Sequence, residues 1–309
     1  MTAPTGDLPT LTAEQARAII QTQFPELVGV SVTLLGEGSD HRAFSVGERS
    51  VFRFPKHVEA ADNLDRTARL TAWLAPESPL ALPVRHFSGQ PTSAFPAPFS
   101  GEDRLAGTAS PVAEPPTGAG ARLLGTFLKR LHAWPAAQAA ALGLESDDDL
   151  GLGEWSAEGL NDLSGAVKAG LVPEPEGALW LAVLLPPARS PEPGRVLHGD
   201  FAAEHVLLDA SGRPVGVIDW SDARLGDPAQ DLAGLLHWGG AALLDAALEE
   251  YGPLDAGARR RAHFYATCRA LADLSFSRET GRAAYTDAGQ RALRWLGALG
   301  GEVADQTPW

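Results

Sequence analysis

The sequence is almost without cysteine and has no long apolar run. Cys268 is the one cysteine among 309 residues, so the chain can form neither an internal disulfide nor a cysteine-based zinc cluster. Nowhere do about 18 apolar residues follow one another, and residues 1–10 lack a basic segment leading into an apolar one. These absences predict a cytoplasmic protein that is neither exported nor inserted into a membrane.

Positive charge is also scarce. The 25 Lys and Arg stand against 39 Asp and Glu, which gives a formal net charge of -14 with His neutral. Residues 1–100 carry 8 basic and 10 acidic side chains, so most of the excess acid lies in residues 101–309. An acidic surface repels phosphate backbones and anionic lipids and attracts cations. We therefore expect no nucleic-acid or membrane partner, and either a cationic ligand or a solvated surface that serves solubility.

Length and composition favour two domains. A single hydrophobic core stops growing at about 250 to 300 residues, and the 44% of hydrophobic residues is enough for a large core. The composition changes to Gly, Pro, Ala, Ser and Thr over residues 107–120, which indicates a loop or boundary. We expect one domain over residues 1–100 and a second over residues 101–309.

The first domain is predicted to hold a small antiparallel sheet with helices. Thr12 and Gln15 fit a capping box, so a helix should begin there and end near Pro25. A helix over residues 60–75 follows from the apolar spacing. Strands are expected over residues 30–35, 43–46, 51–54, 81–87 and 95–99.

The second domain is predicted to be mostly helical, with one β-hairpin embedded in it. Its apolar spacing indicates helices over residues 123–131, 229–237, 241–251, 256–277 and 284–299, and a loop, helix and loop over residues 173–194. Two apolar runs, residues 206–209 and 215–219, are joined by a Ser-Gly turn and predict the hairpin.

The hairpin carries polar residues that together indicate chemistry. Asp200 precedes its first strand and Asp219 ends its second, so both carboxylates can reach one mouth beside His205. Phosphoryl transfer needs such a set, because one carboxylate orients the attacking hydroxyl while other groups hold Mg²⁺ on the nucleotide phosphates. One such aspartate alone would more often be a turn or capping residue.

Three motifs follow one another around this hairpin: His198-Gly199-Asp200 with His205 five positions after the aspartate, Ile218-Asp219-Trp220, and Asp227-Pro228-Ala229-Gln230-Asp231-Leu232. Their order and spacing resemble the aminoglycoside phosphotransferase family of kinase-like enzymes, which includes macrolide and other small-molecule kinases. The resemblance implies an α+β, bilobal protein-kinase-like fold with a small antiparallel-sheet N-terminal lobe for the nucleotide and a mostly helical, catalytic C-terminal lobe.

The resemblance also implies roles for these residues. Asp200 would be the catalytic base or hydroxyl-orienting residue, and Asp219 would bind Mg²⁺ or Mn²⁺. His205 stands where the family usually has Asn, and a neutral imidazole can replace an amide oxygen as a metal ligand. ATP or GTP is implied as co-substrate. Three residues are expected to support the loop without chemistry of their own: His198, Asp227 and Asp231.

The first domain gives weaker signals for nucleotide binding. A turn at the place of the family's nucleotide-covering loop contains Gly36, Gly38 and Ser39, although a Gly-x-Gly is more often an ordinary turn. Arg53 takes the place of the phosphate-binding lysine, with Lys56 as the alternative.

The glutamate that should pair with this cation from the next helix is missing. Its aligned place is near Thr67, and Asp65 and Glu59 are the acids close to it. A catalytically weak, nucleotide-binding pseudokinase therefore stays an alternative. The retained Asp200 and Asp219 argue against it.

The acceptor is expected to be a small-molecule alcohol bound by the second domain. Its excess acid favours a cationic, aminoglycoside-type antibiotic, whereas a macrolide would need a wide apolar pocket built from aromatic residues. Homoserine, choline and sugar-amine kinases share the fold, and the sequence gives no oligomeric state. The acids considered for contacting a cationic acceptor are Glu145, Asp147, Asp148, Asp149, Glu154, Glu158, Asp162, Asp222, Glu249, Glu250, Asp273 and Glu279.

Overall fold

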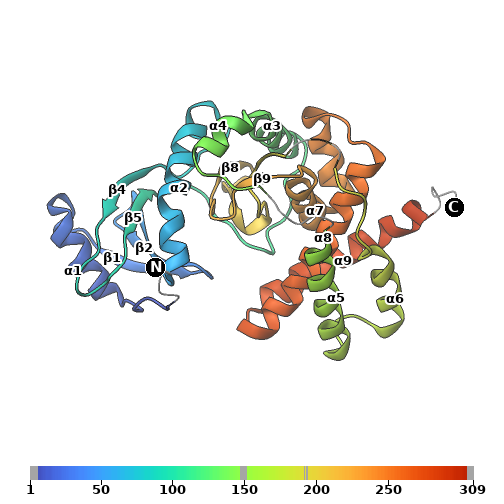
Figure 1. Ribbon diagram of the computed structural model, residues 1–309, viewed down its shortest axis with the longest axis horizontal. Helices are drawn as coiled ribbons and strands as arrows, with labels where there is room; N and C mark the ends of the chain where they lie inside the picture. Colours follow the sequence, from blue (N-terminus) through green and yellow to red (C-terminus); the bar gives the residue numbers. More distant parts are fainter. Residues whose placement is uncertain (1–5, 147–151, 191, 193, 305–309) are drawn as a thin grey trace. The chain divides into compact units, whose positions relative to one another are not determined.

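A computed structural model describes residues 6–146, 152–190, 192 and 194–304 of the chain (Figure 1). The chain divides into two compact units, Met1–Ala106 and Gly107–Trp309. The first contains an antiparallel sheet and the second is mostly helical, which confirms the predicted fold class.

The first unit is a five-stranded sheet with two helices. All of its neighbouring strands pair antiparallel, in the order β1-β2-β3-β5-β4. The elements are α1 (Ala13–Gln23), β1 (Val32–Glu37), β2 (His41–Val46), β3 (Ser50–Pro55), α2 (Val58–Leu74), β4 (Arg85–Gly89) and β5 (Phe99–Asp103), with 3₁₀ turns at Pro25–Leu27 and Ala75–Glu77.

Local sequence signals explain how this unit begins. Thr12 Oγ1 accepts the Gln15 N–H at 3.2 Å, and Gln15 Oε1 accepts the Thr12 N–H at 2.8 Å, which confirms the capping box. The core beneath α1 is built of phenylalanines, of which Phe54 and Phe99 stack with ring centroids 4.4 Å apart. Because alternate residues of β3 point to opposite faces, Arg53 leaves this core while Phe54 enters it.

Two predicted strands were wrong by about four residues. The structure has β4 at Arg85–Gly89 and β5 at Phe99–Asp103, where residues 81–87 and 95–99 were expected. The apolar residues there suggested strands, but Pro83, Pro96 and Pro98 have no N–H to give to a ladder. The shift places Glu102 of β5 beside β3.

The second unit contains seven described helices and two short β-ladders. β7 (Val206–Leu208) and β8 (Pro214–Val217) form the predicted hairpin. The ladder of β6 (Arg195–Leu197) with β9 (Arg224–Gly226) was not predicted, nor were two of the helices, α4 and α5. The helices are α3 (Ala119–Ala133), α4 (Ala136–Ala141), α5 (Gly153–Lys168), α6 (Glu174–Val183), α7 (Ala229–Tyr251), α8 (Ala256–Thr280) and α9 (Ala283–Ala304).

Helix α7 is interrupted at a pair of glycines. Gly239 and Gly240 leave the helical conformation, and Gly240 has φ 62° and ψ -158°. Only glycine adopts that backbone conformation without strain. The interruption agrees with the two separate helices predicted from residues 229–237 and 241–251.

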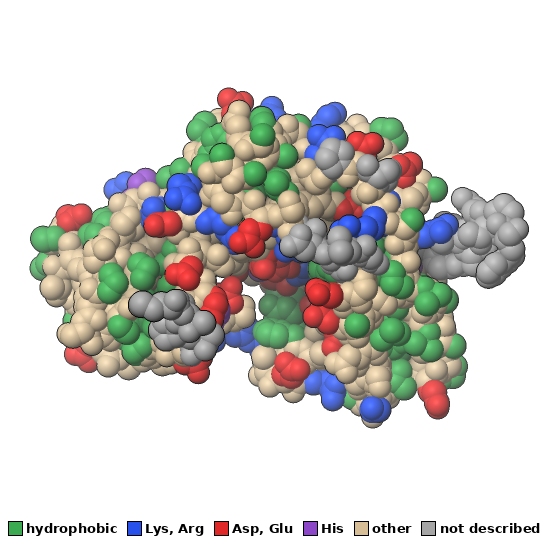
Figure 2. All heavy atoms as spheres, in the orientation of Figure 1, with side chains coloured by type: hydrophobic (Ala, Val, Ile, Leu, Met, Phe, Trp, Pro, Cys, Tyr) green, Lys and Arg blue, Asp and Glu red, His purple; other side chains and the backbone are tan. Residues whose placement is uncertain are grey.

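The surface around α5 and α6 is apolar in places. Figure 2 shows hydrophobic side chains gathered over α6, where its exposed leucines lie. Within the described ranges, none of the helices combines the length and the apolar character that crossing a membrane requires. The exposed leucines of this surface are Leu160 in α5, Leu179 and Leu181 in α6, and Leu185, which follows α6.

Helices α3 and α7 pack so closely that a methyl group should separate them. A Cβ atom at Gly125 would lie 1.9 Å from the main-chain oxygen of Ala247. We expect Gly125→Ala to reduce the free energy of unfolding by about 2 to 3 kcal/mol, the range of overpacked cores, and thermal unfolding of the variant measures this. The control is Gly177→Ala, in which the new Cβ atom would lie 3.6 Å from Val167 Cγ2, an ordinary contact distance. The midpoint of thermal unfolding of this control should stay within about a degree or two of the wild type or rise. Equal midpoints for the two variants would contradict the close packing.

Candidate active site

The loop between β6 and β7 begins with a buried histidine. His198 Nε2 donates to the main-chain oxygen of Ile218 at 3.0 Å, and its Nδ1 accepts the N–H of Asp200 at 3.3 Å. Burial lowers the pKa of His198, so the ring is neutral and serves as a spacer. It ties the start of the loop to the end of β8.

Asp231 of α7 holds the main chain of the same loop. Its Oδ2 accepts the N–H of His198 at 2.9 Å and its Oδ1 accepts the N–H of Gly199 at 3.0 Å. His132 of α3 faces Oδ2 through Nε2 at 3.1 Å. Burial raises the pKa of Asp231, but its hydrogen bonds and the nearby imidazoles outweigh this and lower the pKa. An ionised, fully buried carboxylate therefore fixes the first two amides of the loop.

Gly199 lets the loop pass against a neighbouring segment. Its φ is 85°, and a Cβ atom would lie 2.0 Å from the main-chain oxygen of Asp222. Both the backbone conformation and the lack of space exclude a side chain here. The loop consequently lies close to residues 219–222.

Asp200 follows at the open side of the loop. Its Oδ1 accepts a hydrogen bond from Nη1 of Arg269 in α8, and its Oδ2 lies 3.4 Å from His205 Nδ1. Burial raises the pKa of Asp200, but the charges of Arg269 and His205 outweigh it and hold the pKa well below its usual range. The carboxylate is therefore ionised at neutral pH.

His205 connects the two aspartates. Its Nδ1 donates to the main-chain oxygen of Asp200 at 2.8 Å, which leaves Nε2 facing Asp219 Oδ2 at 3.7 Å. Burial lowers the pKa of His205, but the carboxylates of Asp200, Asp219 and Glu204 outweigh it and raise the pKa. The raised pKa favours the protonated ring, in which Nε2 also carries a hydrogen and faces the Asp219 carboxylate. A metal ion bound at Nε2 would take the place of that proton.

Asp219 adopts a backbone conformation that is rare outside glycine. Its φ is 64°, and Ser221 Oγ donates to its Oδ1 at 3.1 Å. Such a conformation costs about 1 to 3 kcal/mol and is found mainly at functional sites. The strained turn directs the carboxylate toward His205, as the sequence led us to expect.

Further acids surround this group. Loss of hydration and the charges of Asp200 and Asp219 raise the pKa of Asp222. Glu204, in the 3₁₀ turn Ala203–His205, accepts a hydrogen bond from Arg269 Nη2 at 3.2 Å. The surroundings are therefore acidic, with Arg269 placed between Asp200 and Glu204 and with Arg224 Nη1 donating to the main-chain oxygen of Asp222 at 3.1 Å.

Sequence reasoning missed Arg269, Glu204 and His132. One signal for Arg269 was available, because it stands in the run Ala-Thr-Cys-Arg-Ala-Leu, where every neighbour is buried. A charged residue inside a buried helix needs a partner of opposite charge. The sequence could thus indicate that a partner exists but not that it is Asp200.

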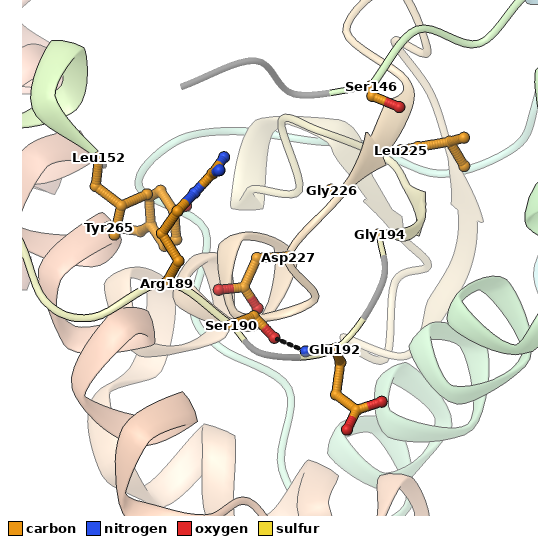
Figure 3. A pocket seen from close by; sticks show the side chains of 10 residues that line it. All are labelled: Ser146, Leu152, Arg189, Ser190, Glu192, Gly194, Leu225, Gly226, Asp227 and Tyr265. Carbon is orange, nitrogen blue, oxygen red and sulfur yellow. Dashed lines mark hydrogen bonds between the residues drawn. The ribbon is translucent and has the colours of Figure 1, made fainter. Parts of the chain in front are cut away.

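Asp227 has a structural position at the start of α7. Its Oδ1 accepts the Ala229 N–H at 3.1 Å, and its Oδ2 accepts a hydrogen bond from Arg261 Nε of α8. It also lines a pocket of about 230 Å³ beside β9, together with Arg189 and Tyr265 (Figure 3). The lining contains neither Asp200 nor Asp219, so this pocket is separate from the aspartate cluster.

In the first unit, the glycine turn is closed by Lys56. Its Nζ lies 3.2 Å from Glu37 Oε1 and donates to the main-chain oxygen of Gly38 at 3.1 Å. Ser39 and Lys56 line a hollow of about 410 Å³. A Cβ atom at Gly36 would meet nothing within 4 Å, so the protein's own packing does not require glycine there. Lys56 anchors the turn in this structure.

Arg53 has an acidic partner that the sequence did not predict. Its Nη1 lies 3.8 Å from Glu102 Oε1 on the adjacent strand β5. The two acids near Thr67 have other partners: Asp65 of α2 accepts a hydrogen bond from Arg85, and Glu59 Oε2 lies 3.2 Å from His57 Nδ1. The acid beside Arg53 therefore comes from the neighbouring strand β5 and not from the helix.

Several other candidates from the sequence lie elsewhere or are core residues. Asp147, Asp148 and Asp149 fall outside the described residues. Glu249 lies 3.3 Å from Arg122, and Asp162 accepts from Ser275 at 2.7 Å. Of six aromatic residues in the second unit that could line an apolar pocket, Trp180, Trp238, Phe264 and Tyr265 are buried, whereas Trp155 and Phe276 are partly exposed.

Comparison with known proteins identifies the family of this chain. A family model described as the phosphotransferase enzyme family matches residues 31–265. The chain is similar to aminoglycoside 2'-phosphotransferase-IIIa in its GDP complex, with 25% identity, a TM-score of 0.66, and coverage of 94% of this chain and 99% of that one. This chain belongs to the phosphotransferase enzyme family, and the resemblance in its motifs is confirmed.

Curated relatives match over shorter stretches. Viomycin phosphotransferase of Streptomyces vinaceus is 41% identical over 69 residues, which is 21% of this chain and 24% of that protein. The uncharacterized protein YcbJ of Bacillus subtilis (strain 168) is 26% identical over 118 residues, 38% of each chain. The chain thus spans well under half the length of these two relatives.

The lowered pKa of Asp231 predicts a pH-dependent contribution to stability. Because its folded pKa lies below the unfolded value of about 3.9, the contribution is complete above that value and is lost as pH falls through the folded pKa. Asp231→Asn places an NH₂ donor against a backbone N–H and should cost about 3 kcal/mol at pH 7. Thermal unfolding from pH 3 to 7 should show a lower midpoint and a flatter acid slope for the variant.

The matched control for this substitution is Asp245→Asn. Asp245 is exposed and lies 3.3 Å from Arg259, and exposed pairs contribute about 0 to 1 kcal/mol. The unfolding midpoint of Asp245→Asn should fall with decreasing pH as steeply as that of the wild type. An unchanged slope in Asp231→Asn would mean that Asp231 is not ionised in the folded protein.

Proposed function

We propose that this protein transfers the γ-phosphoryl group of ATP or GTP to a hydroxyl of a small molecule, with aminoglycoside-type cationic antibiotics as the first acceptor class. The observation that carries the proposal is the convergence of Asp200, His205 and Asp219 around one hairpin. Family membership and the likeness to a GDP-bound aminoglycoside phosphotransferase support it.

The residues of the second unit have separable tasks in this reaction. Asp200 accepts the hydrogen bond of the acceptor hydroxyl and directs its lone pair toward phosphorus. Its charged state, fixed by Arg269 and His205, lets it receive the proton as the new bond forms. His198 and Asp231 keep the loop in place and take no part in the chemistry.

His205 and Asp219 suit a divalent cation. Two ligands bound to one ion at about 2.1 Å lie at most about 4.2 Å apart, and Nε2 and Oδ2 are separated by 3.7 Å. Mg²⁺ is commonly held by one or two protein ligands together with nucleotide phosphates, so this pair is sufficient. When bound, Mg²⁺ or Mn²⁺ would neutralise charge on those phosphates.

The first unit would supply contacts to the nucleotide. Gly36 and Gly38 offer main-chain groups without side chains, and Ser39 offers a hydroxyl in the same turn. Arg53, paired with Glu102, is the phosphate-binding cation, while Lys56 holds the turn. A guanidinium is a competent phosphate donor because its planar fork matches two phosphate oxygens.

Acidic residues around Asp200 support a cationic acceptor. Asp222 and Glu204 lie near the catalytic carboxylate, and the charge of Asp273 also acts on this group through Arg269. Carboxylates beside the acceptor attract ammonium groups and orient them. Four of the six aromatic residues that a macrolide pocket could use, Trp180, Trp238, Phe264 and Tyr265, are buried, so a macrolide is the less favoured acceptor.

A direct screen tests the proposed function. The full-length protein would be incubated with Mg·ATP or Mg·GTP and with aminoglycosides, viomycin, a macrolide, homoserine or choline. Nucleoside diphosphate release, with the mass of one added phosphoryl group on the acceptor, identifies the product. The proposal predicts transfer to a cationic antibiotic. Nucleotide binding with no transfer to any acceptor would instead favour a pseudokinase.

Asp200→Asn should separate binding from chemistry. The amide cannot take a proton, so kcat should fall by about 10² to 10⁴-fold, while the nucleotide affinity, measured by calorimetry, should change by less than about threefold, because Asp200 acts on the acceptor hydroxyl. Asp209→Asn is the control, because Asp209 sits in the turn of the same hairpin and bonds only to its neighbours. Wild-type turnover in Asp200→Asn would exclude Asp200 from catalysis.

His205→Asn should change the preference for the metal. Imidazole suits Mn²⁺ better than Mg²⁺, which favours oxygen ligands. The variant should retain turnover with Mg²⁺ and lose any advantage that the wild type shows with Mn²⁺. Rates of both proteins measured across a titration of each metal give the comparison. Identical metal profiles would show that His205 does not bind the ion and only packs the loop.

A further inference from the structure

Arg269 connects a C-terminal helix to the catalytic loop. Its guanidinium donates through Nη1 to Asp200 Oδ1 and through Nη2 to Glu204 Oε1, the latter at 3.2 Å. The two acids are four residues apart in the loop, and Arg269 comes from the middle of α8, 69 residues away. One cation thus bridges both ends of the segment that carries Asp200.

The guanidinium is charged and well enclosed. Burial lowers the pKa of Arg269, but the carboxylates of Asp200, Glu204 and Asp273 outweigh it and raise the pKa further. Only 19% of the side chain is exposed. A planar guanidinium with two carboxylate partners has little freedom to rotate, so its position fixes theirs.

The hydrogen bond from Arg269 determines which carboxylate oxygen of Asp200 can accept a hydrogen bond from the acceptor hydroxyl. Oδ1 is taken by Arg269. Oδ2 lies 3.4 Å from His205 Nδ1, but that nitrogen donates to the main-chain oxygen of Asp200 at 2.8 Å. Among the described contacts, Oδ2 is therefore the oxygen left to accept a hydroxyl proton.

We propose that Arg269 is a positioning residue for phosphoryl transfer, which holds the Asp200 carboxylate so that Oδ2 faces the acceptor hydroxyl. This inference rests on the proposed function, in which Asp200 orients that hydroxyl. Arg269 acts through Asp200 and Glu204 and makes no contact with the reacting atoms. Errors of about 1 Å in the placement of a catalytic group can reduce a rate by about 100-fold.

The chain offers a matched control on the same helix. Arg261 lies two turns before Arg269, is also buried, and donates to Asp227, which caps α7. Its ion pair resembles that of Arg269 in burial and partner type but does not touch Asp200. A comparison of the two arginines therefore separates loss of stability from loss of catalytic alignment.

The test measures kcat and KM for Arg269→Gln, Arg269→Lys and Arg261→Gln, after correction for the folded fraction. The acceptor is the antibiotic that gives the highest turnover in the screen, and hydrolysis of the same Mg-nucleotide by water is followed in parallel. Arg269→Gln should lower kcat by about 100-fold with nucleotide KM within twofold. Arg269→Lys should lie between this variant and the wild type, since an ammonium reaches one acid at a time. Arg261→Gln should lower the thermal midpoint and leave corrected kcat within twofold.

A crystal structure of Arg269→Gln supplies a readout independent of turnover. The inference predicts that the Asp200 carboxylate rotates or takes several orientations. A wild-type orientation combined with reduced kcat would overturn it, because Arg269 would then act on the acceptor directly. Corrected kcat within twofold of the wild type in Arg269→Gln would overturn it as well.

Failure of the inference differs from failure of the proposed function. If the wild type transfers phosphate neither to an acceptor nor to water, the proposed function fails and the role of Arg269 falls with it. If the wild type is active and both arginine-to-glutamine variants lose activity only in proportion to their unfolded fraction, the positioning role alone is wrong.

Discussion

The buried carboxylate of Asp231 is the interaction on which the second unit depends. It accepts the amides of His198 and Gly199 and faces His132, so one residue of α7 connects the loop to α3. A buried charge is tolerated only when its hydrogen bonds are satisfied, and these donors satisfy it. Once the loop is held there, Asp200, His205 and Asp219 come together around the hairpin.

Local patterns predicted much of this molecule. The capping box at Thr12, the interruption of α7 at Gly240 and the hairpin that separates Asp200 from Asp219 all depend on residues close in sequence. The motif order also indicated the family, which the family model and the structural likeness show. Where prolines stood inside apolar runs, apolar character alone misplaced two strands.

The sequence alone could not predict contacts between residues that lie far apart along the chain. Arg269 is 69 residues from Asp200, and no sequence pattern around either residue identifies the other as its partner. Similarly, the acid beside Arg53 depends on the pairing of β3 with β5, and the sequence placed β5 about four residues too early. A charged residue in a buried segment predicts that a partner exists, but tertiary packing chooses that partner.

Hydrogen exchange of the loop amides tests the central claim, that Asp231 holds the catalytic loop, most directly. The His198 and Gly199 N–H groups would be followed by NMR in the wild type and in Asp231→Asn at pH 7, with amides of β3 as an internal reference. The account predicts that both loop amides exchange at least about tenfold faster in the variant, which corresponds to about 1.4 kcal/mol, while β3 is unchanged. Equal protection of His198 and Gly199 in the two proteins would contradict it.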